Sequence, residues 1–197
     1  MSTVISNVPE LCRRARDSQG ALASASTETK DRVLRQVARL LEDHAEAILT
    51  ANALDLDEAQ ARGLSDAMVD RLRLTHERIN GLAAGVLEVA ALPDPVGALI
   101  EQTQRPNGLL VGRMRIPLGV IAMIFESRPN IVVDAGVLCL KSGNACILKG
   151  GSEARHSNAA LVQVLHAALE SCGLPPDVVV SLTDRGQVAE LLEQAET

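Results

Sequence analysis

The segment from Pro117 to Gly151 constrains the fold of this chain more than any other part of the sequence. It contains two continuous apolar runs, residues 120–125 and 145–148, and each predicts a strand that is buried on both faces. Between them, Pro129 suits the first turn of a helix and Gly143 suits its exit. Strand, helix and strand in this order predict an α/β fold with a parallel sheet.

The sequence beyond this segment continues the alternation of strands and helices. Ser152 is placed to cap a long helix that ends at Gly173, and residues 178–182 predict a third strand. Thr183 or Asp184 then caps a final helix. Three strand–helix repeats are half of a doubly wound parallel sheet. We expect the last strand of this half sheet to expose an edge, which would favour association.

The chain before about Leu92 is expected to be helical. Apolar residues recur at steps of three and four from Val33 to Leu49, which predicts one helix that Ser26 or Thr27 caps and Gly63 ends. Two shorter helices follow, and residues 96–117 then predict a β-hairpin around a turn rich in Pro, Asn and Gly. The expected division is a helical segment over residues 1–95, the hairpin over 96–117 and the half sheet over 118–197.

Composition and charge exclude several classes of protein. The net charge is −6 and Phe125 is the only aromatic residue, so the chain has neither the basic surface nor the stacking side chains of a nucleic-acid binder. No apolar run approaches the roughly 18 residues of a membrane span, and no signal peptide is visible. We expect a soluble, cytoplasmic protein without nucleic-acid or membrane partners.

The cysteines and histidines predict neither a metal site nor a nucleophile. The four cysteines form no CxxC pair and the four histidines form no zinc pattern. An activated thiolate needs a nearby positive charge or a helix N-terminus. Packing is a simpler role than catalysis for each of them, and we assign no catalytic residue. These cysteines are Cys12, Cys139, Cys146 and Cys172.

The clearest candidate site is the run Lys149-Gly150-Gly151-Ser152, which follows the second strand. Ligands of open α/β sheets bind at the carboxyl ends of the strands. A lysine charge beside backbone without side chains suits a phosphate-bearing ligand. The alternative is an exposed lysine in an ordinary glycine-rich turn.

A second candidate lies after the first strand, in Glu126-Ser127-Arg128-Pro129-Asn130. This turn leads into a helix N-terminus, whose free amide groups are electropositive. Arg128 can hold a carboxylate or phosphate through paired hydrogen bonds, and Asn130 can donate to a developing oxyanion. An ordinary strand-to-helix loop with one exposed arginine is the alternative.

The run PLGVIAMIFESRPNIVVDAGVLCLKSGNACILKGGSEA, with upstream NALDLDEAQARGLSDAMVDRLRLTHERINGLA and LPDPVG and downstream SCGLPPDVV, closely resembles the gamma-glutamyl phosphate reductases. They are the proline-biosynthesis family of the aldehyde dehydrogenase superfamily. The resemblance covers practically the whole chain. It implies an aldehyde dehydrogenase-like fold in which the hairpin serves oligomerisation.

The resemblance also implies an activity, namely NADPH-dependent reduction of L-glutamate 5-phosphate to L-glutamate 5-semialdehyde and phosphate. A cysteine thiolate of the family attacks the acyl phosphate, and the thioacyl enzyme is then reduced. Lys149 matches the lysine that contacts the adenosine ribose. Many relatives hold the ribose hydroxyls with a glutamate three residues later, where this chain has Ser152, followed by Glu153. A small neutral residue there leaves room for the 2′-phosphate of NADPH.

The largest departure from the family is the length. None of the four cysteines matches the nucleophile motif, so the resemblance implies an N-terminal portion without the catalytic domain, and we expect no reductase activity from this chain alone. The alternative is a catalytically inactive nucleotide-binding or subunit-assembly fragment. For the full-length family, the resemblance implies a homo-oligomer and glutamate 5-kinase as a channelling partner.

Overall fold

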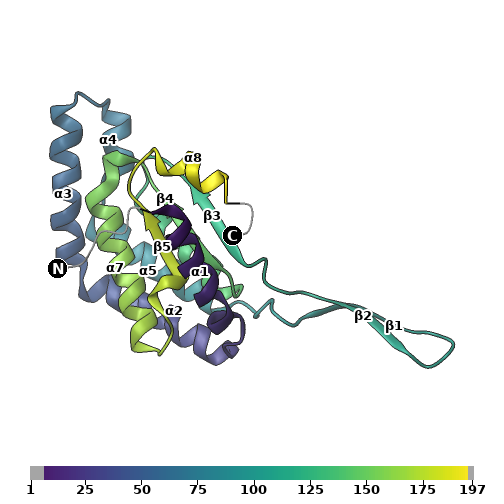
Figure 1. Ribbon diagram of the computed structural model, residues 1–197. Coiled ribbons are helices and arrows are strands. Elements are labelled where there is room, and N and C mark those ends of the chain that lie inside the picture. The colour runs from purple at the N-terminus through teal and green to yellow at the C-terminus, as the bar shows by residue number, and fades with distance from the viewer. Residues whose placement is uncertain (1–6, 195–197) are drawn as a thin grey trace.

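The computed structural model describes residues 7–194, which form a layered α/β body and one projecting hairpin (Figure 1). The expected α/β class is confirmed, with helices before the hairpin and a parallel sheet after it. The helices are α1 (Val8–Ala23), α2 (Thr27–Asp43), α3 (Ala45–Ala61), α4 (Asp66–Leu72), α5 (His76–Ala91), α6 (Ile131–Lys141), α7 (Arg155–Ser171) and α8 (Gln187–Leu192). The strands are β1 (Leu99–Gln104), β2 (Leu110–Met114), β3 (Val120–Ile124), β4 (Ala145–Lys149) and β5 (Val179–Leu182).

The sheet has the order β3-β4-β5, and both pairs of neighbours are parallel. Parallel neighbours need crossover connections, and these are right-handed in almost all proteins. The crossover helices α6 and α7 therefore lie on the same face of the sheet and pack on each other. On the opposite face, α1 packs across all three strands and also contacts α8 (Figure 1). The second layer of helices, α2, α3 and α5, covers α6 and α7.

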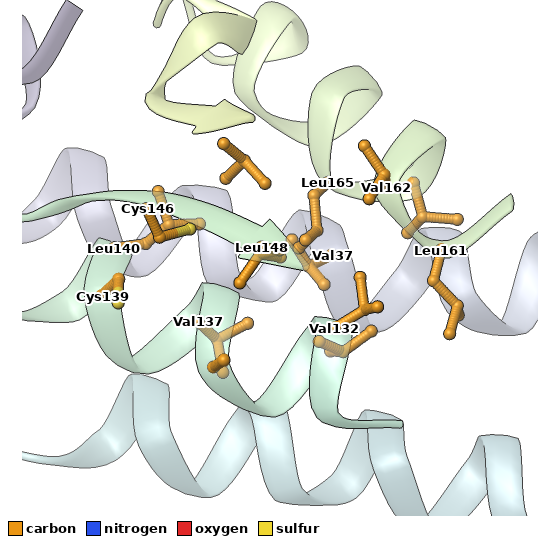
Figure 2. Close-up of a cluster of buried hydrophobic side chains, with 14 of the residues drawn as sticks. Val37, Val132, Val137, Cys139, Leu140, Cys146, Leu148, Leu161, Val162 and Leu165 are labelled. Carbon is orange, nitrogen blue, oxygen red and sulfur yellow. The ribbon is translucent and has the colours of Figure 1, made fainter. Parts of the chain in front are cut away.

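The core lies between the sheet and the crossover helices (Figure 2). Leu148 of β4, Leu140 of α6 and Leu165 of α7 are each at most 1% exposed. Val37 of α2 reaches the same cluster, so one apolar core joins the N-terminal helices to the sheet. Burying an aliphatic side chain of this size contributes about 1.5–3 kcal/mol. This shared core holds the ends of the strands in place. The division of the chain into a helical segment, a hairpin and a half sheet at residues 95 and 117 stays a prediction.

The prediction of one helix from Thr27 to Gly63 is wrong. The chain breaks at His44, which ends α2 and begins α3. The break lets the two halves pack on different partners, α2 on α5 and α3 on α7. Ser26 does cap α2, because its hydroxyl accepts from the backbone N–H of Thr29. The sequence around His44 carries no glycine or proline, so nothing local marks the break.

The predicted cap of the long helix is also wrong. Ser152 opens a short 3₁₀ turn, and α7 begins only at Arg155. Its N-terminus is capped instead by the buried carboxylate of Asp55, which accepts from the backbone N–H groups of His156 and Ser157 at 3.0 and 2.8 Å. A side chain from a distant helix thus satisfies amide groups that a local cap would otherwise hold.

The cap of the last helix differs from the prediction as well. Gly186 is its N-cap residue, and neither Thr183 nor Asp184 occupies that position. Asp184 still takes part, because its carboxylate accepts from the backbone N–H of Gly186 at 2.6 Å. The acidic side chain therefore orders the turn before α8 rather than the first turn of the helix.

The two expectations about the outer strands have different outcomes. We expected β3 to be covered on both faces, and this is wrong, because β3 is half-buried and Ile124 is 52% exposed. We also expected the last strand to expose an edge, and β5 does lie at one edge of the described sheet, where its backbone pairs only with β4 although its side chains are largely buried. In a doubly wound sheet the second half adds beside the first strand. The edge that such a second half would cover is therefore that of β3.

The predicted hairpin is confirmed as β1 and β2, which pair antiparallel. Every residue of both strands is exposed, and the hairpin extends away from the body (Figure 1). No other element between residues 7 and 194 covers its apolar side chains. They include Leu99, Ile100, Leu110, Val111 and Met114, all more than 40% exposed.

Candidate functional site

The predicted residues Lys149, Gly150, Gly151 and Ser152 lie together in a cavity of about 550 Å³, the sheet-end cavity. It is located where β3 and β4 end and α8 passes over them, which is the ligand-binding position of open α/β sheets. Its volume falls within the range of small-molecule sites. The other lining residues are Ile124, Phe125, Glu126, Glu153, Arg185, Val188, Ala189 and Leu192.

Lys149 is the last residue of β4 and is only 5% exposed. Its ammonium group donates to the carbonyl oxygen of Gly150. The glycine run permits this tight turn, since a Cβ on Gly151 would lie 2.1 Å from a carboxylate oxygen of Glu153. A larger residue at position 151 would displace that carboxylate.

Glu153 joins the two candidate loops. Its Oε1 accepts from the backbone N–H of Ser127 at 2.9 Å and from the Ser127 hydroxyl at 2.7 Å. Burial alone would raise the pKa of Glu153, but the hydrogen bonds from Ser127 and the charge of Lys149 outweigh it and lower the pKa. Ser127 has φ of +41°, an uncommon value for a residue with a side chain, and the two bonds hold it there.

The sheet-end cavity combines cations with an apolar wall. Lys149 and Arg185 supply positive charge, and the Arg185 guanidinium has no hydrogen bond or ion pair to any other residue between 7 and 194. The α8 side chains Val188, Ala189 and Leu192 supply the apolar surface. Cations beside an apolar wall suit a ligand that has both a phosphate group and a flat apolar group.

Arg128 and Asn130 lie in a different cavity of about 440 Å³, the arginine cavity. The structure therefore does not bring all of the predicted site residues together. This cavity lies between the β3–α6 connection on one side and α4, α5 and the residues between them on the other. Its lining residues are Asp70, Arg71, Arg73, Leu74, Arg78, Gly81, Leu82, Gly85, Arg128, Asn130 and Asp134.

Asn130 precedes the first residue of α6, and its Nδ2 donates to Asp134 Oδ2 at 2.8 Å. Burial raises the pKa of Asp134, and the bond from Asn130 offsets this only in part. A side-chain amide has two donor hydrogens. Asn130 therefore keeps one N–H for another acceptor while Asp134 fixes its orientation.

Sequence reasoning missed several residues of both cavities. Arg185 and α8 were not recognised as part of the sheet-end cavity, and Arg71 and Arg73 were not recognised at all. The pair had a local signal, because Arg71-Leu72-Arg73-Leu74 alternates between exposed arginines and buried leucines. No short-range pattern, however, shows that this segment faces the β3–α6 connection.

The four cysteines line neither cavity. Cys12, Cys139 and Cys146 are buried, and Cys172 follows the last residue of α7. Cys12 packs in the core through α1. Among residues 7–194 no group of three or more His, Cys, Asp or Glu side chains is arranged to hold a metal ion. The same residues include no helix that is long and apolar enough to cross a membrane.

Curated relatives of this chain are gamma-glutamyl phosphate reductases. The protein from Nitratidesulfovibrio vulgaris strain DP4 is 54% identical over 195 residues, which cover 98% of this chain and 46% of that protein. The one from Desulfatibacillum aliphaticivorans is 51% identical over 95% of this chain and 45% of its own length. The chain thus spans a little under half the length of these relatives.

Solved structures agree with the sequence comparison. Gamma-glutamyl phosphate reductase from Thermotoga maritima superposes with a TM-score of 0.91 at 36% identity, over 94% of this chain and 45% of that one. Gamma-glutamyl phosphate reductase from Saccharomyces cerevisiae superposes with a TM-score of 0.90 at 32% identity, over 97% of this chain and 49% of that one. An acetylating aldehyde dehydrogenase from Geobacillus thermoglucosidasius shares the fold. Its TM-score is 0.74 at 17% identity, over 95% of this chain and 39% of that one.

The family model described as "Aldehyde dehydrogenase family" matches residues 5–197. Together with these relatives, the match confirms the resemblance inferred from the Pro117–Gly151 segment and its flanks. The chain therefore belongs to the aldehyde dehydrogenase family, and its relatives there are the gamma-glutamyl phosphate reductases.

Proposed function

We propose that this chain supplies the NADPH-binding region and part of the substrate cavity of a reductase in proline biosynthesis. The reaction would reduce L-glutamate 5-phosphate to L-glutamate 5-semialdehyde and release phosphate. The observation that carries the proposal is the grouping of Lys149 and Ser152 with Arg185 in the sheet-end cavity. The names of relatives at 51–55% identity support the same activity.

The sheet-end cavity fits the adenosine-phosphate end of a dinucleotide. Its two cations suit phosphate oxygens, and its α8 wall suits one face of an adenine ring. The cofactor, when bound, supplies the hydride for the reduction. Lys149 would hold the ribose and its phosphate, while Gly150 and Gly151 would let the backbone approach closely.

The local charge arrangement favours NADPH over NADH. Ser152 is exposed and neutral, and Glu153 engages Ser127 with one carboxylate oxygen. The Arg185 guanidinium adds positive charge to the same cavity and has no ion-pair partner between residues 7 and 194. A 2′-phosphate would therefore meet a small hydroxyl and two positive side chains.

Arg128 and Asn130 would act on the substrate from the arginine cavity. Arg128 is exposed and offers a guanidinium to an anionic group, and Asn130 retains a donor N–H beside the N-terminus of α6. A donor in this position stabilises negative charge that develops on a carbonyl oxygen. No cysteine lines either cavity, so the nucleophile of the proposed reaction would lie outside residues 1–197.

The experiment titrates NADPH and NADH against the purified chain, with nucleotide fluorescence or calorimetry as the readout. We expect NADPH to bind more tightly, and Lys149→Ala to weaken its binding about tenfold or more, which corresponds to about 1.4 kcal/mol or more. Ser152→Glu should weaken the binding of NADPH more than the binding of NADH, because the new carboxylate repels a 2′-phosphate. Ser152→Ala is the matched control and should retain the preference.

The result that would overturn the cofactor proposal is equal or absent binding of both nucleotides by the parent chain. In that case the alternative of a subunit-assembly role would remain. We also expect no NADPH-dependent turnover of L-glutamate 5-phosphate by the 197-residue chain, because it places no cysteine at either cavity. A cytoplasmic location, a homo-oligomer and a glutamate 5-kinase partner stay predictions for the full-length enzyme.

A further inference from the structure

We propose that Arg71 and Arg73 form, together with Arg128, a binding site for a carboxylate or phosphate group of a small substrate. The site lies in the arginine cavity, and two of the three arginines proposed to bind the anion come from the helical segment rather than from the sheet. The inference rests on the proposed function for the identity of the substrate, which is L-glutamate 5-phosphate. It assigns part of substrate recognition to residues around the end of α4.

The charges in the arginine cavity do not balance. Arg78 is already engaged, since its guanidinium donates to the backbone oxygens of Asp70 and Arg73 and forms an ion pair with the Asp70 carboxylate. The guanidinium groups of Arg71, Arg73 and Arg128 have no hydrogen bond or ion pair to another residue between 7 and 194. Asp134 is then the only remaining carboxylate in the described lining. Positive charge is left in excess, and an anionic group would neutralise it.

The backbone around Arg73 is fixed before any ligand arrives. The buried side chain of Asn52 donates to the carbonyl oxygen of Leu72 and accepts from the N–H of Leu74, both at 2.8 Å. Leu72 and Leu74 are 0% and 7% exposed, so the residues on both sides of Arg73 are anchored in the interior. Arg73 itself is exposed at the cavity wall. A preorganised arginine loses less freedom on binding than a mobile one.

The chemistry of the opposite wall matches an acyl phosphate that also has a carboxylate. Arg128 and Asn130 lie on the β3–α6 connection, where the proposed function puts the reacting carbonyl group. Such a substrate has an anionic group at each end, and a guanidinium binds either one through two parallel hydrogen bonds. Arginines on both walls can therefore hold the two ends of one molecule.

The test measures binding of two probes, inorganic phosphate and glutarate, to the 197-residue chain by amide NMR shifts at low ionic strength. We expect at least one probe to shift the amides of residues 71–74 and 128–131. Arg73→Gln should weaken that binding about tenfold, as loss of a charge-assisted bidentate contact predicts. Arg71→Gln is the second variant, in case Arg73→Gln perturbs folding. Arg35→Gln, which removes an exposed charge from α2, is the matched control.

Binding that falls with Arg73→Gln or Arg71→Gln and not with Arg35→Gln supports the site, and the probe that binds identifies the group it accepts. The inference is overturned if neither probe binds the parent chain, or if both cavity variants bind as well as Arg35→Gln. The NADPH titration separates this result from the proposed function. If the chain binds NADPH and neither phosphate nor glutarate, only the proposal of the anion site is overturned. If it binds one of the two anions and not NADPH, only the cofactor proposal is overturned.

Discussion

At the scale of single residues, a buried ion pair fixes the end of the helical segment. Lys30 of α2 is 1% exposed, and its ammonium group pairs with Asp94. Asp94 also accepts from the Thr27 hydroxyl and from the backbone N–H of Val96, both at 2.9 Å. These contacts connect the start of α2 to the segment that leads into the hairpin. Nothing local in the sequence marks Lys30 as buried, because its partner is distant along the chain.

We predict that Asp94→Asn destabilises the chain by about 3–5 kcal/mol, because it leaves the Lys30 ammonium buried without a counter-charge. Urea unfolding followed by circular dichroism measures the change. The double variant Lys30→Met with Asp94→Asn should recover much of the loss, since it removes the buried charge. Equal destabilisation in the single and double variants would show that the charge is not the cause.

A second prediction at this scale concerns Glu153 and pH. The folded state lowers the pKa of its carboxyl group, so the ionised form stabilises folding. This contribution is present above the unfolded pKa of about 4.3 and is lost as pH falls through the folded value. Glu153→Gln should therefore lower the free energy of unfolding at pH 7. The difference in unfolding free energy between the parent and Glu153→Gln should shrink below about pH 4.3.

Chemical denaturation of the parent and Glu153→Gln across pH 3–7 tests this behaviour. Glu126→Gln is the matched control, because Glu126 is exposed and has no hydrogen-bond or ion-pair partner among residues 7–194. A gap between the parent and Glu153→Gln that stays constant with pH would contradict the role given to the Ser127 contact.

At the scale of elements, α7 depends on a cap that comes from α3. Asp55 is fully buried and accepts from two backbone N–H groups and the Ser157 hydroxyl, the last at 2.6 Å. Asn52, one turn earlier on the same helix, donates to the Ser157 hydroxyl at 3.0 Å. This short network connects the start of α7, which follows the Lys149–Ser152 loop, to the anchored backbone around Arg73. It is a second physical link between the two cavities, beside the contact of Glu153 with Ser127.

We predict that Asp55→Ala destabilises the chain by about 1–3 kcal/mol, because it leaves buried amide groups without acceptors. Thermal and urea unfolding measure the loss. Hydrogen exchange should show the first-turn amides of α7 opening more readily. Asp57→Ala, an exposed position on the same helix, is the control and should change stability little. Unchanged exchange at His156 and Ser157 would rule out the capping role.

The comparison between sequence and structure differs from one element to the next. Local patterns found the hairpin, the three strands of the sheet and the Ser26 cap, because apolar periodicity and turn chemistry are short-range properties. They failed at His44 and Ser152, where α3 and Asp55 decide the outcome from a distance. For the same reason, the sequence predicted Lys149 and Arg128 as site residues and missed Arg73 and Arg185. Their proximity to those residues is created only by folding.

At the scale of the whole molecule, two surfaces lack a partner within residues 7–194. One is the hairpin with its flank, where Ile116 and Leu118 are 72% and 87% exposed. The other is the open side of β3, whose backbone pairs only with β4 and whose side chains are half-buried; β5 also pairs only with β4, but its side chains are largely buried. Exposed apolar patches and unpaired strand edges both favour association. The hairpin presents far more apolar area than β3, so we expect it to dominate.

The last prediction is that the purified chain self-associates at micromolar concentration through the hairpin. Light scattering after size-exclusion chromatography, or sedimentation velocity, measures the mass. Leu110→Lys with Ile116→Lys should shift the chain toward the monomer, because two ammonium groups cannot be buried in an apolar contact without a large cost.

Leu54→Lys with Leu87→Lys is the matched control, since it changes two exposed leucines on α3 and α5 and should leave the mass unchanged. Ile124→Lys tests the β3 route, and if it alone lowers the mass, the open strand rather than the hairpin drives assembly. A monomeric parent chain with one sharp unfolding transition would contradict both routes, because it would show that neither surface is apolar enough to pair in water.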